Sequence, residues 1–274
     1  MAMNQTDAVP ETSTIECLPN ELLGAICDLL PNRDIKNLRL ASPLLGQNCQ
    51  LQIRRVFISP DPLNIYVPHA IATHDIYRLG VEEIIWDDAT LVPSGGYGDL
   101  FHDYSDESDE EVPQELAAEV QERFAWFYSG CKSSIKAAKD HNAMSYQESF
   151  EYYNLLESQQ GVIIESKTDE DIFRYTIRQL PNLRRVVVTP AAHGYLFEPL
   201  YKTPMTRSFP YGFIYPVPQG WPTPLPGHGW AFARPWVGND AVEEDKSLYH
   251  GFQVVTKVLA EEKHNVTELM LDAH

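Results

Sequence analysis

The sequence predicts an α+β protein in which three short N-terminal helices precede an irregular helix–strand domain with long loops. Between residues 18 and 45, apolar residues recur at spacings of three and four and are interrupted by prolines, as in short amphipathic helices. Later in the chain, a helix-like segment, a short break and an apolar strand-like segment recur three times. The 274 residues therefore suit one small module and one medium-sized domain.

The three N-terminal helices are predicted from their start and stop signals. Pro19 suits a first helical position, and Pro31 disfavours continuation of that helix. Asn32 is expected to cap the second helix, and Ser42, followed by Pro43, to cap the third. The first helix has an apolar face made of Leu22, Leu23, Ile26, Leu29 and Leu30. A module of about 40 residues rarely holds a sufficient core, so it should need the following domain, a partner, or both.

The order of these residues resembles a known helical module, the F-box. The matching features are the Leu-Pro-Asn-Glu-Leu opening at residues 18–22, Ile26, the break at residues 29–31, Asp34-Ile35, Leu38 and Ser42. An F-box docks a substrate receptor onto the Skp-type adaptor of a cullin-RING ubiquitin ligase. The resemblance implies a non-catalytic substrate-receptor subunit of a Skp–cullin–F-box ubiquitin ligase, with the F-box at residues 17–60 and an unknown protein target.

The resemblance also implies an adaptor-binding set within the three helices. Its members are Leu18, Pro19, Leu22, Ile26, Leu29, Leu30, Ile35, Leu38 and Leu45. Two positions depart from the family pattern, because Leu45 stands where an aromatic residue is frequent and Pro43 where a basic residue is common. We therefore expect altered adaptor affinity at this end of the module.

Composition and charge narrow the class of partner. A net charge of −18 repels phosphate backbones and anionic lipid surfaces, so neither nucleic acid nor a membrane is an expected partner. The N-terminus has no apolar signal-peptide core and no apolar run reaches membrane-spanning length, which favours a cytoplasmic or nuclear location. Four scattered cysteines without C-x-x-C spacing predict free thiols in a reducing compartment and no metal site. No nucleotide, metalloprotease or hydrolase motif is present, so we assign no cofactor and no catalytic residue.

Acidic residues concentrate in one part of the chain. Fourteen of them, and no lysine or arginine, lie between Arg78 and Arg123. Residues 94–112 read as an acidic loop, in which Ser108 precedes three acids, the context that acid-directed kinases prefer. Residues 1–16 read as a disordered tail.

Residues 61–274 are predicted to form the substrate-recognition domain. A weak helix is expected at residues 63–79, and stronger helices after Pro113, Ser145 and Thr168 and around residues 248–259. Strands are expected at residues 81–87, 183–188 and 266–271.

Three segments of this domain align as helix end, break and strand: residues 74–89, 174–191 and 257–273. The recurrence resembles an irregular leucine-rich-repeat-like solenoid, and the whole chain resembles fungal F-box proteins with such repeats. Three copies are few for a solenoid and no capping unit follows, so the sequence favours a C-terminally truncated chain over a short family member.

A proline- and aromatic-rich loop is predicted at residues 190–238, with ten of the 20 prolines and three of the five tryptophans. A disordered linker would be poor in aromatic residues, so the loop is expected to be ordered on the domain. Its rings either cover a face of the repeats or bind the target. The candidate target-binding residues are Tyr211, Trp221, Trp230 and Trp236.

Two alternatives to the ligase receptor stay open. An adaptor-bound scaffold without a ligase role would share the same N-terminal motif. An unrelated enzyme could carry helices that merely resemble the module, and a deep polar pocket with clustered titratable side chains would favour it.

Overall fold

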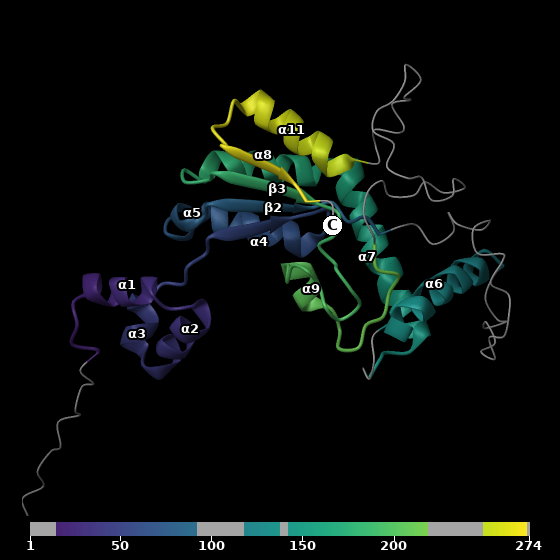
Figure 1. Ribbon diagram of the computed structural model, residues 1–274, viewed down its shortest axis with the longest axis horizontal. Helices are drawn as coiled ribbons and strands as arrows, with labels where there is room; N and C mark the ends of the chain where they lie inside the picture. The colour runs from purple at the N-terminus through teal and green to yellow at the C-terminus, as the bar shows by residue number, and fades with distance from the viewer. Residues whose placement is uncertain (1–14, 92–117, 138–141, 219–248, 273–274) are drawn as a thin grey trace, which may run out of the picture. The chain divides into compact units, whose positions relative to one another are not determined.

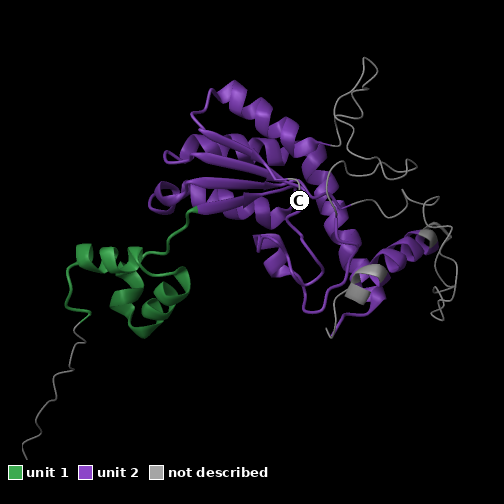
Figure 2. Cartoon of the chain, in the orientation of Figure 1, with its two compact units in different colours: residues 1–54 green, residues 55–274 purple. Residues whose placement is uncertain are grey.

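The structure, a computed structural model, describes residues 15–91, 118–137, 142–218 and 249–272. The chain divides into two compact units, Met1–Arg54 (unit 1) and Arg55–His274 (unit 2) (Figure 2). It contains both helices and a four-stranded parallel sheet, which is consistent with the predicted mixture of helix and strand. Within the described ranges, no helix is both long and apolar enough to cross a membrane.

Unit 1 consists of the three expected short helices, α1 (Asn20–Asp28), α2 (Asn32–Ala41) and α3 (Pro43–Asn48). Its buried core is Leu23, Cys27, Ile35, Leu45 and Cys49. The predicted cap of α3 is confirmed, because the Ser42 side chain accepts a hydrogen bond from the Leu45 N–H at 3.3 Å. Ile15 packs against this core, so the predicted tail ends before Ile15 and not at residue 16.

Two of the predicted helix starts in unit 1 need correction. Pro19 lies one residue before α1, and its carbonyl accepts hydrogen bonds from the N–H groups of Leu22 and Leu23. Asn32 is the first residue of α2 and does not cap it. Instead, its side chain exchanges hydrogen bonds of 2.6 and 2.8 Å with the backbone of Gln52. This pair holds the chain leaving α3 against the start of α2.

The sheet of unit 2 has four parallel strands in chain order: β1 (Arg55–Ile58), β2 (Glu83–Asp87), β3 (Arg185–Thr189) and β4 (Glu268–Leu271) (Figure 1). The three predicted strands are present within two residues of their expected starts. The first strand was not predicted, and it moves the boundary from residue 60 to Arg54, because Arg55–Ile58 pairs with Glu83–Trp86. Each strand begins with one charged residue followed by three apolar residues.

Helices connect successive strands, as parallel pairing requires. They are α4 (Pro62–Thr73), α5 (Tyr77–Gly80), α6 (Ala118–Ala137), α7 (Tyr146–Ser166), α8 (Thr168–Gln179), α9 (Pro204–Ser208) and α11 (His250–Glu262). The capping box of Ser145 and Glu148 at the start of α7 is confirmed. Thr168 is not a cap: Lys167 precedes α8 in a left-handed conformation, with φ of 57°.

One face of the sheet packs against helices. Alternate residues of a strand point to opposite faces, so Ile84 and Trp86 share one face, and both are fully buried. The Trp86 ring meets Phe173 of α8 edge-on, with centroids 5.6 Å apart. Gly251 of α11 lies against the same ring, where a β-carbon would come within 2.1 Å of Trp86 Nε1. The absence of a side chain at residue 251 therefore sets how closely α11 approaches the sheet.

Residues 190–217, called here the covering segment, reach the opposite face of the sheet through Tyr201. Ile85 and Val187 point to this face and are nearly fully buried. Tyr201 crosses it: its ring lies 6.1 Å from the Phe57 ring of β1, and its hydroxyl donates to Asp272, just after β4, at 3.4 Å. The segment is anchored to α4 by Asn64, whose side-chain oxygen accepts from the Met205 N–H at 3.1 Å.

A side chain at residue 251 should destabilise unit 2. We expect Gly251→Ala to lower the free energy of unfolding by about 1–3 kcal/mol, because its methyl group would overlap Trp86 and the Asp88 carboxylate. Urea denaturation of the full chain measures this. The control is Gly161→Ala in α7, where no atom lies within 4 Å and alanine should stabilise the helix by up to about 1 kcal/mol. Equal stability of Gly251→Ala and wild type would contradict the close packing of α11.

Candidate functional site

Unit 1 exposes a row of apolar side chains along α1. Pro19, Leu22, Ile26 and Leu29 follow one another at spacings of three, four and three, so they lie on one side of the helix. Leu22 is 52% exposed and Leu29 87% exposed, while Ile26 is half-buried. The opposite side of α1 supplies Leu23 and Cys27 to the core. The helix is therefore apolar on both sides, and unit 1 covers only one of them.

The nine predicted adaptor-binding residues fall into three groups. Pro19, Leu22 and Leu29 are exposed, and Leu18, Ile26, Leu30 and Leu38 are half-buried. Ile35 and Leu45 are 0% and 3% exposed. This corrects their expected role: they form the core that holds the three helices together and present no surface to a partner.

The sequence pattern missed two members of the exposed apolar surface. Leu40 at the end of α2 is 86% exposed, and Leu44 at the start of α3 is 44% exposed. The buried residues of these helices are Ile35 in α2 and Leu45 in α3. Leu40 and Leu44 lie off the buried side of their helices, and this position could have indicated that they are exposed.

Unit 2 carries a row of alternating charges across its four strands. Arg55, Glu83, Arg185 and Glu268 occupy equivalent positions at the strand starts. Arg55 pairs with Glu83, and Arg185 lies 3.5 Å from Glu83 and 2.6 Å from Glu268. These partly exposed ion pairs contribute little stability individually, but they fix the register of the strands.

At the other end of the strands lies a buried polar cluster of Asp87, His193 and Tyr215, each at most 5% exposed. His193 Nδ1 and the Tyr215 hydroxyl are 2.9 Å apart, and His193 Nε2 lies 3.6 Å from Asp87 Oδ2. Among the described residues, Asp87 Oδ2 has no hydrogen-bond partner. The cluster joins β2 to the covering segment beneath the protein surface.

Burial sets the charge state of this cluster. It raises the pKa of Asp87 to about 8 and lowers the pKa of His193 to about 4, because the charged form of each group loses its hydration. Burial also raises the pKa of Tyr215. At neutral pH the cluster is therefore mostly uncharged, which is the condition under which it can stay buried.

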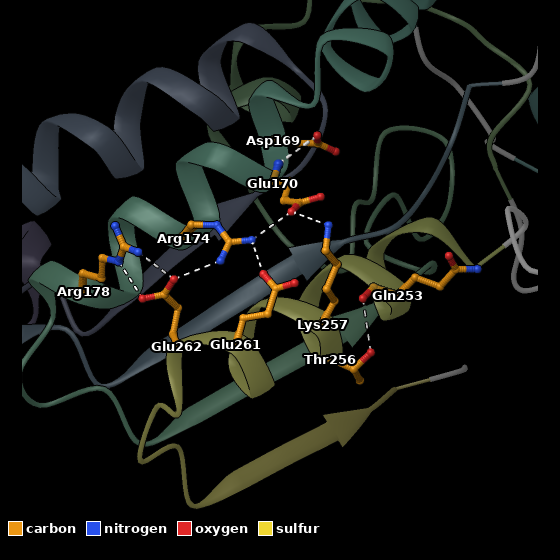
Figure 3. Close-up of polar contacts among 9 residues, drawn as sticks. All are labelled: Asp169, Glu170, Arg174, Arg178, Gln253, Thr256, Lys257, Glu261 and Glu262. Atoms are coloured by element: carbon orange, nitrogen blue, oxygen red, sulfur yellow. Dashed lines mark hydrogen bonds and ion pairs between the residues drawn. The ribbon is translucent and has the colours of Figure 1, made fainter.

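Ion pairs link α8 to α11 on the helical side of unit 2. Figure 3 shows Arg174 between Glu170, Glu261 and Glu262, with Arg178 beside Glu262. The two arginines lower the pKa of Glu262 to about 2. This network borders a surface hollow of about 680 Å³ at the start of the strands. Two ion pairs line the hollow, Arg178 with Glu262 and Arg184 with Glu82, together with Lys263 and His264.

The predicted target-binding residues divide between described and undescribed parts of the chain. Tyr211 is 81% exposed and available to a partner, whereas its neighbours Phe213 and Tyr215 are buried. The structure describes residues 190–218 of this stretch, and several of their aromatic rings pack in the core of unit 2. Trp221, Trp230 and Trp236 lie outside the described residues, as do the acidic loop at residues 94–112 and Ser108. The four cysteines are free thiols, with Cys17 exposed and the others buried.

No protein-family model, curated protein or solved structure matches this chain.

The buried cluster predicts a pH dependence of stability. The unfolded Asp87 loses its proton near pH 3.8 and the native one near pH 8, so native stability falls as pH rises through this window. His193 acts oppositely between about pH 4 and 6.5, because only the unfolded chain binds its proton there. Of these two groups, only Asp87 still contributes between pH 6.5 and 8. We expect wild type to lose up to about 2 kcal/mol more than Asp87→Asn across that interval.

Urea denaturation at pH 6.5 and pH 8 measures the difference. The control is Asp75→Asn, which changes an exposed carboxylate and should show the wild-type slope. If Asp87→Asn and wild type lose the same free energy between the two pH values, Asp87 does not titrate in this interval.

Proposed function

We propose that this chain is a substrate-receptor subunit of a Skp–cullin–F-box ubiquitin ligase. Unit 1 acts as the F-box and binds the Skp-type adaptor, and unit 2 presents a target protein. The chain itself does not catalyse the formation of a covalent bond. It raises the effective concentration of the target at the ubiquitin-conjugating enzyme.

The observation that carries the proposal is the exposed apolar row of α1. Leu22 and Leu29 are far more exposed than core leucines, and the described part of unit 1, residues 15–54, holds no element that covers them. Exposed aliphatic side chains gathered on one helix are typical of an interface that a partner desolvates. The resemblance of residues 18–42 to the F-box favours a Skp-type adaptor as that partner.

The arrangement of unit 2 supports the receptor half of the proposal. Four parallel strands follow one another in chain order, each returning through helical segments, as successive turns of an irregular leucine-rich-repeat-like solenoid do. Repeat domains of this kind serve mainly as protein-binding surfaces. Tyr211, exposed on the covering segment, is the described residue that we assign to target contact.

Binding of the purified chain to a Skp-type adaptor tests the proposal. We expect wild type to co-elute with the adaptor in gel filtration, and the double variant Leu22→Asp with Leu29→Asp to lose the complex. Both side chains are exposed, so the variant should keep the wild-type melting temperature while placing carboxylates in an apolar interface.

The matched control is Val162→Asp, which places the same charge on an exposed apolar position of α7 in unit 2 and should leave the complex intact. A wild-type chain that forms no complex would remove the main support for the function. Adaptor binding without cullin in complexes purified from cells would instead favour the scaffold role.

A further inference from the structure

Strand β4 leaves one edge of the sheet of unit 2 open. It pairs with β3 on one side, and the other side has no strand neighbour within the described residues (Figure 1). Leu269, Met270 and Leu271 are 44%, 46% and 53% exposed, although their counterparts in β2 and β3 are buried. An open edge with exposed apolar residues is a surface on which another strand can pair.

The backbone of β4 can form hydrogen bonds with a further parallel strand at this edge. The N–H groups of Glu268 and Asp272 donate to the carbonyls of Arg184 and Val188, at 3.1 and 3.0 Å. Because alternate residues of a strand direct their backbone groups to opposite sides, those of Leu269 and Leu271 point away from β3. This outward set supplies two donors and two acceptors.

Residues at equivalent positions in the four strands form rows across the sheet. These rows indicate which side chains a fifth strand next to β4 should carry. Glu83 and Arg185 each have an opposite charge on both sides, whereas Glu268 has one only on the β3 side, and its side chain is 51% exposed. A fifth strand that continues this row carries lysine or arginine at that position. The next three rows are apolar in all four strands, so the fifth strand continues with three apolar residues.

We propose that the β4 edge binds an extended segment of a partner protein, one basic residue followed by three apolar residues, as a fifth parallel strand. Main-chain hydrogen bonds to Leu269 and Leu271 supply affinity, and Glu268 selects the basic residue and sets the register. The inference rests on the geometry of unit 2 alone. It does not depend on adaptor binding by unit 1.

A short peptide segment fits this edge better than a second copy of the chain. Strand β4 has only four residues, so pairing at this edge buries much less area than a stable association of two folded proteins needs. A net charge of −18 on each chain also opposes self-association. A short basic segment meets neither obstacle.

Fluorescence anisotropy with labelled peptides tests the proposal on the full chain without adaptor. The probe carries the sequence of Arg185–Thr189 between two serines. We expect it to bind wild type about fivefold more tightly than the same peptide with glutamate in place of arginine. An N-methyl group on the middle valine should abolish binding, because it removes a donor and blocks the edge.

Two chain variants separate edge pairing from general attraction of a cation. Glu268→Lys should reverse the preference, binding the glutamate peptide more tightly than the arginine peptide, although the chain stays strongly acidic. Leu269→Pro removes an outward N–H that makes no bond to β3, so it should abolish binding while the thermal unfolding curve stays close to wild type.

Three results would overturn the proposal. One is equal binding of the arginine and glutamate peptides to wild type. Another is an arginine preference that persists in Glu268→Lys. The third is self-association of the chain, seen by sedimentation velocity and disrupted by the peptide, which would assign the edge to a second copy. None of these outcomes bears on adaptor binding, so the two proposals fail separately.

Discussion

A parallel sheet must be covered on both faces, because its strands are apolar on both sides. In unit 2, helices α8 and α11 cover the face of Ile84 and Trp86, and Tyr201 of the covering segment lies beside Phe57 on the other face. The two coverings are chemically different: one is held by close packing against Trp86, the other by polar anchors.

The polar anchors follow from the sheet itself. Where parallel strands end together, their backbone and the first loop residues bring polar groups under cover, and each such group needs a partner. Ser59, Asp87 and Thr189 are buried at the carboxyl ends of the strands. The covering segment donates the Ala191 N–H to Thr189 and the Met205 N–H to Asn64, whose side chain in turn donates to Ser59. Its His193 lies 3.6 Å from Asp87 and 2.9 Å from the Tyr215 hydroxyl. Proline and aromatic residues in this segment thus have a structural role before any role in binding, since the prolines limit its freedom and the rings fill the face.

Much of this fold could be predicted from periodicity and capping. The three helices of unit 1, the Ser42 cap, the capping box at Ser145 and three of the four strands were readable, because each depends on neighbours in sequence. The strand at Arg55–Ile58 was missed because it follows the helical module directly. The pattern of one charge and three apolar residues was nevertheless its signal, shared with the other three strands. The pairing of the strands shows why the pattern recurs, because it aligns the charged residues in one row and the apolar residues in the next three rows.

The candidate surfaces were less predictable for the same reason. The resemblance to an F-box grouped Ile26, Ile35 and Leu45 in one adaptor-binding set, but only the packing of the three helices shows which of them form the core. Ile35 and Leu45 became core, while Leu40, which no spacing marked, became exposed. The partnership of Asp87 with His193 and Tyr215 joins residues more than 100 positions apart and carries no local signal.

The two units leave apolar surface exposed on different kinds of element. Unit 1 is too small to enclose both sides of α1, so its excess lies on a helix, where side chains alone are available to a partner. Unit 2 encloses its sheet faces but not its last strand, so its excess lies at an edge, where backbone groups are available as well. A helical surface selects a partner by shape and apolar area, and a strand edge selects it by register and charge. The two proposed surfaces share no residue, so the two proposed partners would not compete for the same side chains.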